Sequence, residues 1–178
     1  KGLWGVPFSE PICGKASTID YYANGKLQIL FGAGTRLHLI DRLGRFVSGF
    51  PIDLGKEILL GPDVYDFNGS RRYNVMVLHK DNTIEMYNLK GQKPASWAGI
   101  RPSETIRDLP ERIIVGGNTF WVVRTSVQTL IYPFGGGQPL TSFEGEQMVL
   151  PDSEVKVVDG SAVELHCYDG KSRTVKLK

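Results

Sequence analysis

Residues 37–51 read LHLIDRLGRFVSGFP and carry the pattern that decides the fold: an apolar strand, a glycine turn and an aromatic residue. The same order returns at residues 84–98, IEMYNLKGQKPASWA, and at residues 129–143, TLIYPFGGGQPLTSF. The aromatic residues that close the three stretches lie 47 and 46 residues apart. A fixed period of this length indicates a structure built from repeated units.

The period extends to both ends of the chain. Trp4 lies 46 residues before Phe50, and residues 165–177, LHCYDGKSRTVKL, form a fourth and shorter copy. We therefore expect a single domain over residues 1–178, with repeats at about 17–62, 63–110, 111–151 and 152–178 and a stub strand in residues 1–10.

Each copy holds several short strand candidates. In the first two copies we expect strands at Leu27–Phe31, Arg36–Asp41, Arg45–Phe50, Asn74–His79, Thr83–Asn88 and Ala95–Ala98. Tight-hairpin pairs such as Asp81-Asn82 and Asp169-Gly170 separate the strands, and no window shows a sustained helical period with caps. Hairpin-built units that repeat every 40–47 residues or so are typical of β-propeller blades. The sequence thus predicts an all-β propeller, and the alternative is a β-sandwich with accidental spacing.

The composition narrows the class of protein. A hydrophobic content of 41% in 178 residues excludes intrinsic disorder. A formal net charge of +2 indicates neither a nucleic-acid partner nor an anionic membrane surface. No apolar run reaches the roughly 18 residues of a membrane span, so none is expected. The two cysteines exclude a disulfide scaffold and a four-thiolate zinc site, while a Cys13–Cys167 bridge and two free thiols both stay open.

The first two copies share a longer motif. Residues 20–51 contain Asp20, then Asn24-Gly25, a strand and hairpin, and Gly49-Phe50-Pro51, and residues 66–97 repeat this order with more departures. The motif resembles FG-GAP/VCBS-type propeller repeats and their quinoprotein-like relatives, and the third and fourth copies depart from it further. The resemblance covers nearly the whole chain as architecture. It implies fold more than function, because propellers host many unrelated activities.

The resemblance also implies a calcium loop with oxygen ligands at alternating positions. Its ligands would be Asp20, Asn24 and Gln28 in the first copy, and Asp66 and Asn68 in the second. Each loop keeps one carboxylate, which is little charge for a calcium ion. The alternative is that these side chains cap turns through bonds to the backbone. We therefore expect no cofactor and keep calcium as the open alternative.

Patterns for catalysis are missing from the sequence. His38, His79 and His166 have no metal-ligand spacing, and no Gly-x-Ser-x-Gly elbow occurs. We therefore name no catalytic residue. Tyr21 and Tyr22, and Tyr65 with Phe67, lie in the loops that enter two successive copies, where aromatic side chains suit a sugar or a protein partner. The alternative is that these rings pack between blades.

These observations favour a non-catalytic module for protein or glycan recognition. One alternative is a domain of a carbohydrate-active or other propeller enzyme, and another is a purely structural module of a larger protein. The resemblance and a first residue other than Met indicate a secreted, periplasmic or cell-surface location. Because unpaired blades expose apolar faces, we expect further blades or a second copy of the chain to complete the ring.

Overall fold

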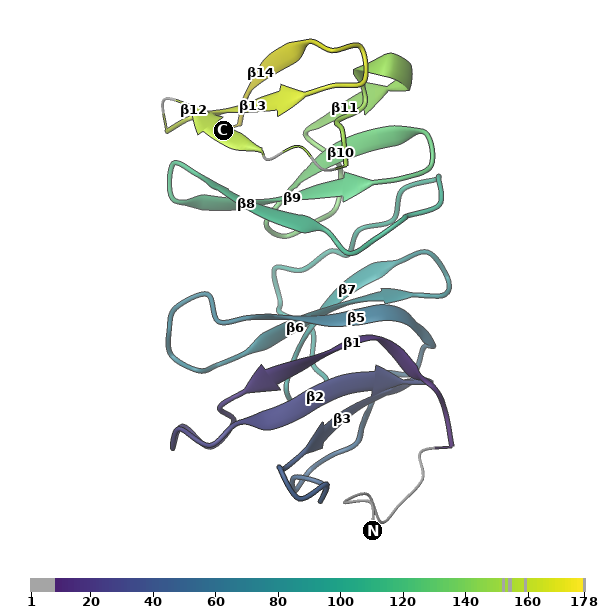
Figure 1. Ribbon diagram of the computed structural model, residues 1–178, viewed down its shortest axis with the longest axis vertical. Coiled ribbons are helices and arrows are strands. Elements are labelled where there is room, and N and C mark those ends of the chain that lie inside the picture. Colours follow the sequence, from purple (N-terminus) through teal and green to yellow (C-terminus); the bar gives the residue numbers. More distant parts are fainter. Residues whose placement is uncertain (1–8, 152, 154, 159, 178) are drawn as a thin grey trace. The chain divides into compact units, whose positions relative to one another are not determined.

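The computed structural model describes residues 9–151, 153, 155–158 and 160–177 (Figure 1). The chain divides into two compact units, Lys1–Ala95 and Ser96–Lys178. The described residues form strands and a single short 3-10 helix, η1 (Gly145–Gln147). Most of the predicted stub strand, including Trp4, lies outside the described residues.

Unit 1 holds two antiparallel sheets. The first sheet has the order β1-β2-β3-β4 and the second the order β5-β6-β7. Their strands are β1 (Ile12–Ile19), β2 (Gln28–Ala33), β3 (Arg36–Ile40), β4 (Ile52–Asp53), β5 (Ile58–Tyr65), β6 (Asn74–His79) and β7 (Ile84–Asn88).

Unit 2 repeats this design. Its first sheet has the order β11-β10-β9-β8 and its second the order β12-β13-β14. The strands are β8 (Glu111–Val115), β9 (Asn118–Arg124), β10 (Gln128–Pro133), β11 (Thr141–Glu144), β12 (Lys156–Val158), β13 (Ala162–His166) and β14 (Ser172–Lys176). Every sheet is an up-and-down meander, since strands adjacent in sequence pair with each other.

The second strand of each sheet recurs at a spacing close to the period predicted from the sequence. Strands β2, β6, β9 and β13 begin at residues 28, 74, 118 and 162, so they are 46, 44 and 44 residues apart. The predicted boundaries at residues 17 and 62, however, fall inside β1 and β5. Gly14 lies within β1, and Gly61 and Pro62 lie within β5, and in the sequence they look like turn residues.

Two predicted strands do not form. In Arg45–Phe50 only Phe46 makes a bridge, to Ile40, and Gly49 then turns the chain with a φ of 88°. Ala95–Ala98 is irregular, which leaves the second sheet with three strands. The glycine conformation ends the extended path because a φ in this range is unfavourable for a strand.

Strands β1 and β5 pack together through glycine. A Cβ on Gly14 would lie 2.9 Å from the backbone nitrogen of Gly61. The Ser17 hydroxyl donates to the Pro62 carbonyl at 3.3 Å, and Lys15 pairs with Asp63 at 2.5 Å. These contacts hold the two sheets of unit 1 face to face.

Each unit has its own core. In unit 1 this core takes alternate side chains of a strand, such as Leu37 and Leu39 of β3 and Val75 and Val77 of β6, and the positions between them are buried too. In unit 2 the core gathers buried side chains of five strands: Ile113, Val115, Phe120, Val122, Ile131, Phe143, Val163 and Leu165. Alternation of this kind is expected when one face of each strand meets a neighbouring sheet.

Two further features concern the chain as a whole. Both cysteines are free thiols, so the Cys13–Cys167 bridge does not form in this structure. Among the described residues, no helix has the length and hydrophobicity that crossing a membrane requires.

Candidate binding surface

Four connections of unit 1 lie at one end of its sheets, and we call this region the loop end. They are the β1–β2 loop (residues 20–27), the start of the β3–β4 connection (41–46), the β5–β6 loop (66–73) and the segment after β7 (89–93). Antiparallel pairing places them together, because β1 and β5 run toward this end and β3 and β7 return to it. Arg71 joins two of the loops, since its guanidinium donates to the Ala23 carbonyl at 3.3 Å.

The β1–β2 loop is organised around the buried carboxylate of Asp20. Its two oxygens accept the backbone amides of Asn24 and Gly25, each at 3.0 Å, and the Arg71 guanidinium lies 3.5 Å away. Burial alone raises the pKa of Asp20, but the amide bonds and the charge of Arg71 outweigh it, so the pKa lies below its ordinary value. The loop is therefore held by an ionised carboxylate that faces inward.

The turn after β3 uses Asp41 in the same way. Its Oδ1 accepts the amides of Leu43 and Arg45, at 2.8 and 3.0 Å, and its Oδ2 accepts Nε of Arg45 at 2.8 Å. The side-chain bond from Arg45 is the largest influence on the pKa of Asp41 and lowers it. This arrangement fixes a tight turn that leaves Arg42 and Leu43 exposed at its tip.

The three tyrosines predicted as ligand-binding residues differ in exposure. Tyr21 is half-buried against the unit 1 core and meets Phe50 edge-on, with ring centroids 5.9 Å apart. Tyr65 is half-buried and stacks on Phe67 at 5.5 Å. Tyr22 leans on Tyr21 but keeps 53% of its surface exposed. Tyr21 and Tyr65 thus pack on neighbouring rings, whereas Tyr22 is accessible to a partner.

A groove of about 440 Å³ lies beside Tyr22, between the β1–β2 loop and the turn after β3. Its apolar lining includes Leu27 and Leu43, which expose 56% and 48% of their surface. Its basic lining is Lys26, Arg42 and Arg45. Isolated exposed leucines are common, whereas here two lie beside an exposed tyrosine around one groove, so apolar surface is concentrated there.

The residues predicted to ligate calcium serve the loops themselves. The Asn24 Oδ1 accepts the amide of Lys26 at 3.0 Å, and the Gln28 Oε1 accepts that of Tyr21 at 2.9 Å. With the Asp20 oxygens also bonded to amides, and Arg71 supplying the positive charge, this donor set fits turn capping and does not fit a calcium cage.

The second predicted calcium loop does not form a set of calcium ligands either. The Asp66 Oδ2 accepts the amide of Arg71 at 2.9 Å, and its Oδ1 is buried without a hydrogen-bond partner among the described residues. Asn68 is exposed. Within the described ranges, His, Cys, Asp and Glu side chains form no cluster of three or more that could hold a metal ion. The absence of a cofactor stays a prediction, with calcium as the alternative.

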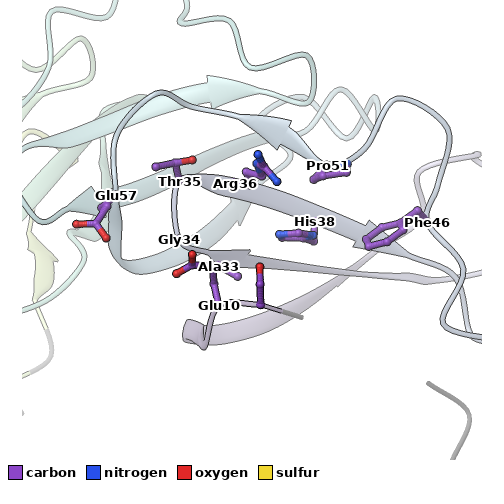
Figure 2. Close-up of a pocket in the computed structure, with 10 residues that line it drawn as sticks. Glu10, Ala33, Gly34, Thr35, Arg36, His38, Phe46, Pro51 and Glu57 are labelled. Carbon is purple, nitrogen blue, oxygen red and sulfur yellow. The ribbon is translucent and has the colours of Figure 1, made fainter. Parts of the chain in front are cut away.

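A second cleft of unit 1, of about 480 Å³, lies on the first sheet around the β2–β3 hairpin (Figure 2). Figure 2 shows His38 between Glu57 and Phe46, with Arg36 close by. The His38 ring stacks on Phe31 at 5.1 Å, and burial, followed by the charge of Arg36, lowers the pKa of His38. Charges of both signs line the cleft, so it selects no ligand charge.

His79 is fully buried within unit 1. Its Nδ1 lies 3.2 Å from the Glu57 carbonyl and its Nε2 lies 3.0 Å from the Tyr87 hydroxyl. Because a carbonyl only accepts, Nδ1 carries the proton and Nε2 accepts from Tyr87 in the neutral ring. Desolvation by burial lowers the pKa of His79. These bonds fasten β6 and β7 to the start of β5, so the role of His79 is structural.

Unit 2 has a cleft of about 450 Å³ in which Arg107, Arg124 and the exposed Tyr168 take part. Arg124 pairs with Glu111 at 2.8 Å, and Asp108 also lines the cleft. The cations of this cleft are therefore matched by carboxylates, unlike those at the loop end of unit 1.

The sequence did not indicate Leu27, Leu43, Lys26 or Arg42 as surface residues of interest. Leu27 directly precedes β2, and Leu43 lies in a turn whose flanks are apolar, so both look like core residues in the sequence. A possible signal was the Asp41–Gly44 turn, since a turn of this kind exposes the residues at its tip.

Comparisons with known proteins bear on the fold. No protein-family model matches the chain, and no curated protein sequence matches it. Solved structures that match include two crystal structures of BBS1N in complex with ARL6DN, one soaked with lead and one with mercury. Both are 13% identical to this chain and cover 96% of it, with TM-scores of 0.59 and 0.58.

This chain covers 54% and 52% of those two BBS1N chains, so it spans about half their length. At this identity the likeness shows the fold alone. The sheets are β-propeller blades, which confirms the all-β prediction. The resemblance to FG-GAP/VCBS-type repeats stays a prediction.

Proposed function

We propose that this chain is a non-catalytic β-propeller module that binds a protein partner through the loop end of unit 1. The observation that carries the proposal is the groove between two internally braced loops, with Tyr22, Leu27 and Leu43 exposed around it. Large apolar side chains held on rigid loops suit an interface, because little conformational entropy is lost when they bind.

The rigidity has a clear source. Asp20 and Asp41 each accept two backbone amides of their own loop, and Arg71 fastens the first loop to the β5–β6 loop. Further support comes from the solved neighbours, since BBS1N was crystallised as a complex with another protein, ARL6DN. A propeller of similar fold thus serves as a protein-binding domain.

Photo-cross-linking tests the proposal. Tyr22 is replaced by benzoylphenylalanine in the intact chain, in the cells that produce it, and Lys171 of unit 2 is replaced in the same way as an exposed control. We expect one protein to be captured from position 22 and not from position 171, and to bind the purified chain saturably. Equal capture from both positions, or none from position 22, contradicts the proposal.

Recognition of a glycan is the second candidate, because Tyr22 could stack on a sugar ring beside the groove. A glycan array probed with the wild-type chain and the Tyr22→Ala variant separates the two candidates. Binding of one glycan class that is lost in the variant would favour the glycan.

The compartment is proposed on the resemblance to FG-GAP/VCBS-type repeats, and the completion of the ring on the apolar faces that unpaired blades expose. We propose a secreted, periplasmic or cell-surface location, which recovery of the protein in the cytosol would contradict. We also propose that further blades or a second copy complete the ring. Light scattering on the full natural gene product tests this, since a monomer with these blades alone contradicts it.

A further inference from the structure

The loop end of unit 1 carries exposed cations without nearby anions. Lys26, Arg42, Arg72 and Lys90 are exposed, and none lies within 4.0 Å of a carboxylate in the part of the chain that the structure describes. They come from all four connections at this end. An excess of one sign on one end of a unit creates a directed positive potential.

The acidic residues of the same region are bonded within their loops, and one of them, Asp41, also lines the groove. Asp20 and Asp41 accept backbone amides and lie beside the Arg71 and Arg45 guanidinium groups, so each carboxylate is neutralised locally. The remaining carboxylate, Asp66, is half-buried, with one oxygen bonded to an amide and the other shielded from solvent. The outward field of the loop end is therefore set by its cations.

The opposite end of unit 1 is different. There Glu57 pairs with Lys80 at 3.1 Å and Asp81 with Lys56 at 2.6 Å, and Glu10 and Asp53 add negative charge. Arg36 is exposed at this end as well. These four carboxylates outnumber the three cations there, so the positive charge is a property of the loop end rather than of the whole unit.

Charge and apolar surface coincide at the groove. Two of the unpaired cations, Lys26 and Arg42, line the same groove as Tyr22, Leu27 and Leu43. A volume of about 440 Å³ is large enough for a bulky side chain. A complementary partner therefore offers carboxylates around an apolar anchor.

We propose that the partner of the loop end is an acidic protein segment that inserts a leucine, phenylalanine or similar side chain into this groove. The inference rests on the proposed function and adds the chemistry of the partner. Lys26, Arg42, Arg72 and Lys90 attract the segment and set its orientation, while Leu27 and Leu43 cover its apolar anchor.

The groove suits a protein segment better than a nucleic acid. Binding to single-stranded nucleic acid relies on several aromatic platforms and a continuous basic track. Here one exposed tyrosine stands beside two exposed leucines, and aliphatic side chains pack on other aliphatic or aromatic side chains. A polyanion without an apolar anchor would leave the leucines uncovered.

The test measures fluorescence anisotropy of a short fluorescein-labelled peptide made of Glu, Asp, Leu and Phe, with the intact chain as titrant. Two control peptides carry Gln and Asn in place of the acids, or Ser in place of Leu and Phe. The protein variants are Lys26→Glu with Arg42→Glu, and separately Leu43→Ser. Lys171→Glu, an exposed lysine of unit 2, is the matched charge control, and circular dichroism verifies that each variant is folded.

We expect saturable binding of the acidic-apolar peptide, which weakens as salt is added. The double reversal should weaken binding by roughly tenfold or more, and Leu43→Ser by roughly tenfold, while Lys171→Glu leaves it within about twofold. Both control peptides should bind more weakly than the probe.

Three results would overturn the proposal. The first is a peptide affinity that the double reversal does not change. The second is that a fluorescein-labelled oligothymidylate binds more tightly than the acidic-apolar peptide and is weakened by the same substitutions. The third is that phosphatidylserine vesicles bind more tightly than the peptide. If position 22 still cross-links a specific protein and the Lys26→Glu, Arg42→Glu variant binds that protein equally well, the partner is not an acidic segment. In that case this inference is wrong and the proposed function stands. If position 22 captures nothing, the proposed function itself fails.

Discussion

Replacing Gly14 by alanine should force β1 and β5 apart, because the added methyl group meets backbone rather than a movable side chain. The new Cβ would lie 2.9 Å from the Gly61 nitrogen and 3.5 Å from the Leu60 Cα. Gly69 is a matched control, since its φ of 63° is close to the 69° of Gly14 and nothing lies within 4 Å of its Cβ position. The two substitutions share the backbone strain and differ in the contact.

The magnitudes follow from these distances. An alanine at a positive φ costs about 1–2 kcal/mol at either position. Carbon atoms in contact prefer about 3.5–4.0 Å, so at position 14 the strands must also separate by several tenths of an ångström. Since β1 is also paired with β2 in its own sheet and cannot move freely, this overpacking adds about 1–3 kcal/mol. We expect about 1–2 kcal/mol for Gly69→Ala and about 2–5 kcal/mol for Gly14→Ala.

Urea unfolding followed by far-UV circular dichroism measures both values. Hydrogen exchange at the amides of β1 and β5 then shows whether the loss of protection is confined to these strands. Equal free energies of unfolding for the two variants would refute the close packing of β1 on β5.

Four further predictions concern unit 1. His79→Leu should lower the free energy of unfolding by about 2–4 kcal/mol, because the Tyr87 hydroxyl and the Glu57 carbonyl lose their partner, and Tyr87→Phe in that background should recover part of it in a double-mutant cycle of urea denaturations. Since burial lowers the pKa of His79 below 6.5, its stabilising contribution is complete above pH 6.5 and is lost as the pH falls through the folded-state pKa; urea midpoints that do not change from neutral pH to pH 5 would contradict this. Partial burial raises the pKa of Asp81, but the bonds from Lys56 and Thr83 outweigh this and lower the pKa to about 2. The contribution of ionised Asp81 to stability is therefore lost only below pH 3.8, and an acid titration should show this as a second loss of stability after that from His79. Calcium should leave the melting temperature unchanged, and a rise on adding Ca²⁺ that Asp20→Asn abolishes would show that the loop does bind the ion.

Some of the fold could be predicted because it depends on local patterns. The strand Asn74–His79 was predicted with its observed bounds, since its apolar run is followed by the Asp81-Asn82 turn. The intervals between the second strands of the four sheets are close to the predicted period, as is expected where successive blades place their strands at matching positions. Strand β1 could not be predicted, because Gly14 resembles a turn residue until β5 is seen to lie against it.

The candidate surface was predictable only in part. The sequence indicated the β1–β2 loop and Tyr22, and the structure places Tyr22 beside the groove. It also indicated Tyr21 and Tyr65, whose rings pack on Phe50 and Phe67. An aromatic residue in a loop can either pack on a neighbouring ring or stay exposed to a partner. Which of the two occurs depends on the neighbours that folding brings close to it.

By itself, the sequence determined the all-β class, and it offered turn capping as one of two roles for Asp20, because strand alternation and turn chemistry act between residues close in the chain. Only the tertiary structure decided that the loops holding Asp20 and Arg71 meet, and that Leu27 and Leu43 face the same groove. These contacts join residues from separate strands and blades, so they exist only after the sheets have paired and packed.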